Sequence, residues 1–88
     1  MTETTNVNAT SAWVKQVDAT SDAVAFISCI SYNAIEVWIG TTVPVVGDKG
    51  HVLQRYEGIG RGQLGAGDMY IRGANGNTGE ATLSLGAT

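Results

Sequence analysis

The chain has 88 residues and a mass of 9.1 kDa, which is enough for one domain. Charged residues make up 15% of it, against about 25% in an average soluble domain. The net charge is −3 with only five Lys and Arg, which argues against binding to nucleic acid or to an anionic membrane through a basic patch. No apolar stretch reaches the length of a transmembrane helix, and a single cysteine cannot form an intrachain disulfide.

Residues 1–11 predict a polar N-terminal arm in front of a single domain over residues 12–88. The arm is rich in Thr and Asn and lacks the basic start and apolar run of a secretory signal, so we expect the chain to be made in a cytoplasm. Such an arm could order against a neighbouring protein by adding a strand to it, with Thr4, Asn6 and Val7 in the contact. The alternative is a frayed terminus without a role.

Apolar residues alternate with polar ones along most of the remaining sequence, which indicates strands and not helices. Half-buried strands are predicted over residues 13–17, 34–39, 51–56, 68–72 and 81–85. The run 23–31 is apolar on both faces, which predicts a central strand that is buried on both sides. No window shows apolar residues at the i, i+3, i+4, i+7 spacing of a three-turn helix.

Turn-forming residues separate these strands at short intervals. Tyr32-Asn33 predicts a tight hairpin, and the glycine-containing segments 47–50, 65–68 and 73–79 predict loops. The pattern favours a small antiparallel β-sandwich or jelly roll of six to eight strands. A domain of this size has a modest core, and this one has neither a disulfide nor a Cys/His zinc site. We therefore expect it to be stabilised by association with other chains.

Motifs that suggest chemistry are weak in this chain. The segment 60–65 matches the dinucleotide fingerprint, but no helix follows it, so we interpret its glycines as bends or bulges. His51 is the only histidine and so the only obvious general base, but no spacing marks a nucleophile or an orienting carboxylate for it. Cys29 lies in the most apolar run and is expected to be a small buried residue. The dispersed acidic residues lack calcium-loop spacing. Because each of these motifs is weak, we expect no enzyme, no metal and no cofactor.

Three larger side chains are candidate interface residues. In its strand, Trp38 has the register opposite to the aliphatic residues, so it lies on the outer face if those residues form the core. Tyr70 and Arg72 share this outward register in a later strand, and Trp, Tyr and Arg are enriched in protein interfaces. A sugar-stacking platform is a rival interpretation. The third is that both faces are covered and Trp38 belongs to the core.

The segments Ile35–Thr42, Gly50–Leu53, Gly65–Gly73 and Gly79–Leu85 resemble small β proteins of tailed bacteriophages. The layout of these phage proteins is a strand that ends in an Ile-Gly step, a Gly-His-Tyr/Val-Leu segment, a Gly-Asp-Lys/Val-Tyr strand and a final Thr-Leu-Ser/Thr strand. This chain has Gly-His-Val-Leu, Gly-Asp-Met-Tyr and Thr-Leu-Ser at the last three places. The resemblance covers more than half of the chain. Such phage proteins are similar to virion components that include the jelly-roll decoration or cement proteins of capsids.

This resemblance implies a structural virion protein on the capsid surface, which stabilises the shell by binding at junctions between subunits of the major capsid protein. We also expect self-association as a dimer or trimer on the capsid, and the low content of Lys and Arg argues against a nucleic acid or membrane partner. The alternative that the resemblance leaves open is a head-fibre or tail-tip module that recognises a cell-surface glycan.

Overall fold

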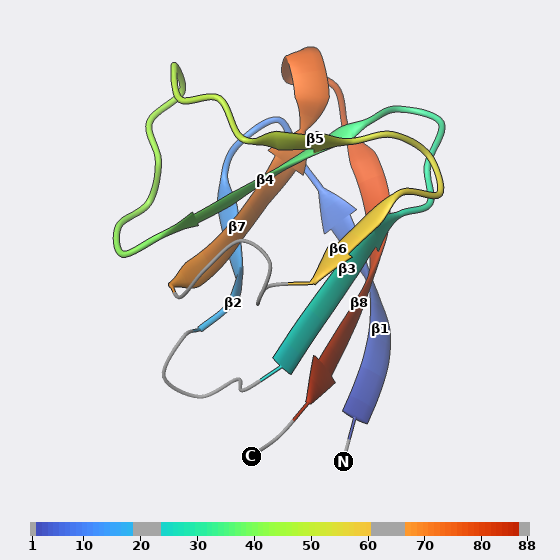
Figure 1. The fold of residues 1–88 in the computed structure, drawn as a ribbon. Coiled ribbons are helices and arrows are strands. Elements are labelled where there is room, and N and C mark those ends of the chain that lie inside the picture. The colour runs from blue at the N-terminus through green and yellow to red at the C-terminus, as the bar shows by residue number, and fades with distance from the viewer. Residues whose placement is uncertain (1, 19–23, 61–66, 87–88) are drawn as a thin grey trace.

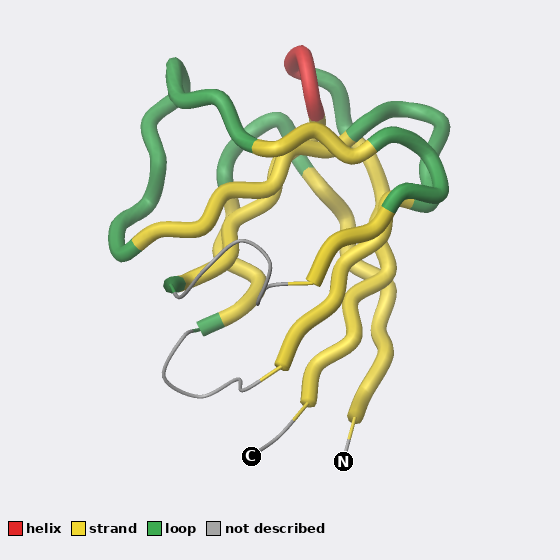
Figure 2. Tube along the Cα trace, viewed as in Figure 1, coloured by secondary structure: helices red, strands yellow, loops and turns green. Residues whose placement is uncertain are grey.

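The computed structural model describes residues 2–18, 24–60 and 67–86, which form a β-sandwich (Figure 1). One short 3₁₀ turn, η1, spans Ala74–Gly76, and every other regular element is a strand (Figure 2). The strands are β1 Thr2–Ala9, β2 Val14–Val17, β3 Val24–Cys29, β4 Ile35–Gly40, β5 His51–Leu53, β6 Gly58–Gly60, β7 Asp68–Gly73 and β8 Gly79–Gly86. The all-β class predicted from the alternation is therefore confirmed.

The strands form two four-stranded antiparallel sheets, one in the order β1-β8-β3-β6 and the other in the order β2-β7-β4-β5. The first strand pairs with the eighth, the second with the seventh, the third with the sixth and the fourth with the fifth. This is the winding of a jelly roll, in which a long folded ribbon wraps around a core.

The core lies between the two sheets and is made by one face of each. Its fully buried larger side chains are Val17, Ile27, Cys29, Ile35, Val37, Met69 and Ile71, and Ala81 and Leu83 complete it from β8. Every second residue of a strand points to the same face, so the predicted alternation in β4, β7 and β8 correctly identified these inward positions. Cys29 is buried as expected.

The N-terminal segment differs from the predicted arm. Residues 2–9 are strand β1, which pairs with β8 without interruption from Thr2 opposite Gly86 to Ala9 opposite Gly79. Val7 packs partly buried against the core and Ala9 is fully buried. The polar composition concealed this strand, because backbone pairing to β8 and two small apolar residues are enough to hold an edge strand. The boundary between an arm and a domain at residue 11 is therefore wrong.

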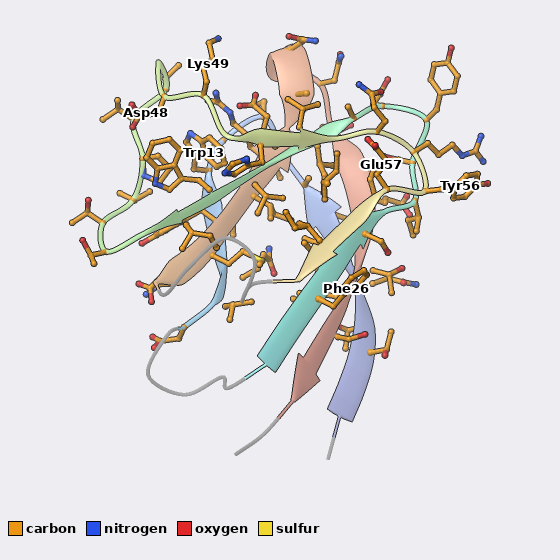
Figure 3. All side chains as sticks on the ribbon, in the orientation of Figure 1. Trp13, Phe26, Asp48, Lys49, Tyr56 and Glu57 are labelled. Carbon is orange, nitrogen blue, oxygen red and sulfur yellow. The ribbon has the colours of Figure 1, made fainter. Side chains whose placement is uncertain are left out.

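Two further expectations need correction. Tyr32-Asn33 does not close a hairpin, because β3 and β4 belong to different sheets and the chain crosses between them at this point. Strand β3 is central in its sheet but buried on one side only, since the Phe26 side chain is 48% exposed on the outer face (Figure 3). No element covers that face in the described residues, so the apolar run 23–31 overstated the burial.

The turn after β7 gives a test of backbone packing. Gly73 donates its N–H to the Thr10 carbonyl, and a Cβ on Gly73 would overlap the Asn77 carbonyl oxygen. Because backbone cannot move aside as a flexible side chain can, we expect Gly73→Ala to lower the free energy of unfolding by about 2–3 kcal/mol. In urea denaturation the control Gly47→Ala should stay within about 0.5 kcal/mol of the wild type, because a Cβ there meets nothing within 4 Å. Equal stability of the two variants would contradict the packing at Gly73.

Candidate functional site

The predicted interface residues Trp38, Tyr70 and Arg72 lie together on the outer face of the sheet β2-β7-β4-β5. Trp38 is directly opposite Tyr70 in the pairing of β4 with β7, and Glu36 is opposite Arg72. The outward register predicted for Trp38 is therefore right. However, Tyr70 is only 5% exposed and Arg72 only 7%, while Trp38 is partly buried. Tyr70 and Arg72 are therefore covered within this chain, while Trp38 keeps part of its surface in solvent.

A long connection between β4 and β5, residues 41–50, lies over Arg72, and we call it the valine loop. Its Val43, Val45 and Val46 side chains are 58%, 67% and 86% exposed, while Pro44 between them is buried. In Figure 1 the loop is the yellow-green segment that projects beyond the sheets on the left. Apolar side chains this exposed on a fixed loop are candidates for contact with another molecule.

Arg72 ties the valine loop to the sheet. Its Nε and Nη2 donate to the two carboxylate oxygens of Glu36, each at 3.3 Å. Its Nη1 donates to the Val46 carbonyl at 2.9 Å, and Nη2 also donates to the Asp48 carbonyl at 2.7 Å. A guanidinium has five N–H donors in a planar fork, and this arrangement uses four of them. The loop backbone is therefore fixed by a charged group that is itself fixed by the sheet.

Trp13 also holds the valine loop, through contacts with Arg72 and with the loop backbone. Its ring lies under the guanidinium of Arg72, with 4.3 Å between the Arg72 Cζ and the ring centroid, a cation–π contact. Its Nε1 donates to the Val45 carbonyl at 3.3 Å, and its ring packs against Trp38 at 6.3 Å between centroids. Figure 3 shows Trp13 on the inner side of the loop that carries Asp48. Trp13, packed against Trp38, therefore supports the loop backbone.

The loop also closes on itself. The N–H of Asp48 donates to the Val45 carbonyl at 3.0 Å, and the N–H of Val45 donates to the Asp48 carboxylate at 3.0 Å. These two bonds define a β-turn with a side-chain bridge across residues 45–48. The two most exposed valines, Val45 and Val46, are therefore held in one conformation.

The Glu36 carboxylate accepts hydrogen bonds from both Arg72 and the valine loop. Burial raises the pKa of its carboxyl, but the hydrogen bond from the Gly50 N–H at 3.0 Å and the contacts with Arg72 outweigh burial, so the pKa lies below its ordinary value. Gly50 must be small to make this approach, because a Cβ would lie 2.6 Å from the Val37 carbonyl oxygen and 2.9 Å from the Trp13 ring. No buried side-chain N or O in the described residues lacks a hydrogen-bond partner.

The other predicted contact residues, Thr4, Asn6 and Val7, lie on β1 in the opposite sheet. Thr4 shares a hydrogen bond of 3.0 Å with Ser84, and Asn6 accepts one of 3.4 Å from the Thr82 hydroxyl. Thr4 and Asn6 are exposed on the outer face. The structure therefore brings these three residues together with one another, but not with the valine loop.

Sequence reasoning missed the three valines and Trp13 as site residues. The signal for the valines was available: three of them surround a proline outside any alternating run and directly before turn-forming residues. A strand would place alternate residues of such a run in the core, whereas a loop leaves them in solvent. No local signal marks Trp13, because its contacts come from residues far along the chain.

Within residues 2–18, 24–60 and 67–86, the remaining motifs form no reactive cluster. His51 is exposed on β5 and makes no side-chain hydrogen bond or ion pair within the described residues. In that part of the chain no group of three His, Cys, Asp or Glu side chains is placed to hold a metal ion. The fingerprint match at 60–65 lies outside the described residues except for Gly60, which ends β6.

Comparison of the chain with protein-family models, with curated proteins and with solved structures finds no match. Among the described elements no helix is long and apolar enough to cross a membrane. The function must therefore be argued from the site itself.

The Glu36–Arg72 pair predicts a pH dependence. Because folding lowers the pKa of Glu36 from 4.5, the unfolded chain takes up the proton first as the pH falls. The stability that this carboxylate contributes is complete above pH 4.5 and is lost as the pH falls through the lower folded value. Glu36→Gln should therefore be less stable than the wild type at neutral pH, by about 3 kcal/mol for a broken buried pair.

Urea denaturation of both proteins from neutral to acidic pH measures this difference. The other carboxyl groups are common to both proteins and cancel in the comparison. We expect the gap between wild type and Glu36→Gln to shrink on acidification. A gap that is constant with pH would show that the Glu36 charge does not stabilise the fold.

Proposed function

We propose that this protein is a structural virion protein that decorates and stabilises a bacteriophage capsid. In this proposal it binds at junctions between major capsid protein subunits, and the valine loop makes the contact. The resemblance of the β4, β5, β7 and β8 sequences to small phage proteins supports the proposal. A second support is the compact sandwich, in which the buried pair Glu36 and Arg72 holds the valine loop in place.

The observation that carries the proposal is an apolar loop that is both exposed and held in place. Val43, Val45 and Val46 are exposed, while Arg72 and Trp13 bind the backbone carbonyls beneath them. A loop that is already ordered loses little conformational entropy on binding, so more of its contact energy remains as affinity. Burying a valine side chain completely is worth roughly 1.5 kcal/mol or more, so three of them supply a useful contact.

The repetition of a shell would make such a modest contact sufficient. A capsid presents the same junction many times. When copies of this chain associate with one another, binding of one copy raises the effective concentration of the next copy at the neighbouring junction. A weak single contact can therefore cover a lattice. The sparse charge and low content of Lys and Arg are consistent with a partner recognised by apolar surface and not by phosphate.

Copy number is the first test of this proposal. The ratio of this chain to the major coat protein in purified particles can be measured by quantitative mass spectrometry. A ratio near one, or a simple fraction of it, is expected for a protein that covers the lattice. A few copies per particle would place it at a vertex, fibre or tail, and absence from the particle would refute the proposal.

The contact itself is tested by charge at the loop. Val46→Asp places a carboxylate on a side chain that is 86% exposed, so the fold should persist while capsid attachment falls by tenfold or more, because the charge would be desolvated on docking. The matched control is Tyr56→Asp, since Tyr56 is 75% exposed and its φ of 68° suits Asp. Figure 3 shows Tyr56 on the side away from the valine loop.

Attachment of each purified variant to particles stripped of the native protein can be measured by sedimentation. Circular dichroism and thermal melting confirm that each variant is folded. If Val46→Asp binds like the wild type, or if Tyr56→Asp loses binding equally, the valine loop is not the contact.

One observation favours the alternative, a head-fibre or tail-tip module that recognises a glycan. A hollow of about 340 Å³ on the β4–β5 side has Tyr32 and the amide-bearing residues Asn33, Gln54, Asn75 and Asn77 among its lining residues. Tyr32 is 87% exposed. An exposed aromatic ring beside several amides is a suitable arrangement for stacking and hydrogen bonding a sugar.

A glycan array and calorimetry test this alternative. If it holds, a sugar binds the wild type, Tyr32→Ala reduces its affinity by at least tenfold, and Tyr56→Ala does not. No binding by the wild type, or equal binding by both variants, would refute a glycan site at Tyr32.

A further inference from the structure

The two sheets have four edge strands, and they differ in how well they are protected against pairing with another chain. β5 and β6 have three residues each. β2 has four residues, a shift in register between Lys15 and Val17, and a lysine that pairs with Asp18 and Asp68. Short length, irregular register and an edge lysine are the usual devices that prevent sheet extension.

β1 has none of these devices. It is eight residues long and its register with β8 is unbroken. Its sequence holds no lysine and no proline, and within the described residues no other strand lies beyond it in the sheet. A long regular edge with open N–H and C=O groups is a template for another strand.

We propose that β1 pairs in antiparallel orientation with β1 of a second copy of this chain. The two sheets β1-β8-β3-β6 would then join across a two-fold axis into one continuous sheet of eight strands. This interface is isologous, so pairing uses the free edge of both copies and leaves neither available for further growth.

The geometry of β1 restricts the register of this pairing. Directly opposed residues in an antiparallel sheet have side chains on the same face, so in a joined sheet even-numbered residues must oppose even-numbered ones. Two registers keep most of the strand paired. One centres the axis on Thr5 and places Thr4 opposite Asn6 of the second copy, and the other centres it on Asn6.

The sequence of β1 suits both registers. Glu3 is the only charged residue in it, and it falls opposite Val7 or Ala9 of the second copy, so no like charges are opposed. On the outer face, Thr4 and Asn6 are exposed and already form hydroxyl and amide bonds to Ser84 and Thr82 of β8. Pairing with a second β1 would continue the same polar ladder across the axis.

A second copy fits this edge better than an unrelated strand for two reasons. The strand opposes no like charges when it pairs with itself, and its Thr and Asn side chains can hydrogen-bond across the axis. In addition, the domain is small and its core lacks a disulfide, so extension of its sheet adds the support that such domains need. The inference does not rest on the capsid assignment. In Figure 1 the β1 edge lies away from the valine loop, so a dimer would leave both loops exposed.

Sedimentation of the intact chain over a range of concentrations tests the proposal. We expect a species of twice the 9.1 kDa monomer mass, populated by about 1 mM even if the pairing is weak. The double variant Thr4→Lys/Asn6→Lys should be a folded monomer, because it opposes lysines across the axis in either register. The matched double variant Thr4→Lys/Asn6→Glu loses the same two side-chain bonds to β8.

The charge of the matched variant distinguishes the registers. It opposes Lys with Glu when the axis is at Thr5, so the dimer survives. It opposes Glu with Glu when the axis is at Asn6, and the dimer is lost. Under mild oxidation, Thr5→Cys should cross-link in the first case and Asn6→Cys in the second, since directly opposed Cβ atoms lie about 4.5–5.5 Å apart. Ser84→Cys, one strand inside the edge, and the buried Cys29 should stay unlinked.

The proposal is overturned if the wild type is monomeric up to about 1 mM and neither cysteine variant cross-links. It is also overturned if a dimer forms that Thr4→Lys/Asn6→Lys does not disrupt. A monomer that binds capsids through β1 would show that a coat strand occupies the edge instead. Solution mass and capsid attachment are separate measurements, so either proposal can fail alone.

Discussion

The arrangement of the outer surface depends on one buried ion pair, Arg72 with Glu36. Taking two charges out of water costs several kcal/mol per ion unless the remaining donors and acceptors also find partners. Here the partners come from the valine loop and from Trp13: two loop carbonyls accept from the guanidinium, the Gly50 N–H donates to the carboxylate, and the indole ring covers the charge. If the loop moved away, it would leave buried donors unsatisfied.

This constraint explains why valines are exposed on a loop that is nevertheless ordered. The loop backbone is held by polar bonds, so its apolar side chains do not need to turn inward to fix it. A conformation that buried Val45 and Val46 would withdraw the carbonyls that Arg72 and Trp13 require. The valines therefore remain in solvent. This exposure is unfavourable in free energy, and a partner that covers the valines removes it.

The two sheets consequently offer different kinds of association. On the outer face of β2-β7-β4-β5 the valine loop lies over Arg72, and its contact would be apolar. No described element covers the outer face of β1-β8-β3-β6, where Phe26 is exposed, and its β1 edge would bind through backbone hydrogen bonds. Apolar burial and strand pairing are independent interactions, so a protein of this size can associate with itself and with a second partner at once.

The sequence by itself indicated six of the eight strands and the buried face of several of them, because side chains alternate with a period of two wherever a sheet has one wet face. Ile35, Val37 and Leu83 were identified correctly for this reason. Only the tertiary structure decided which strand pairs with which, and it made residues 2–9 a strand where composition indicated an arm. It also decided that Arg72 supports a loop. The hydrogen-bond partners of Arg72 lie at least 24 residues away along the chain, so they come together only when the jelly roll closes.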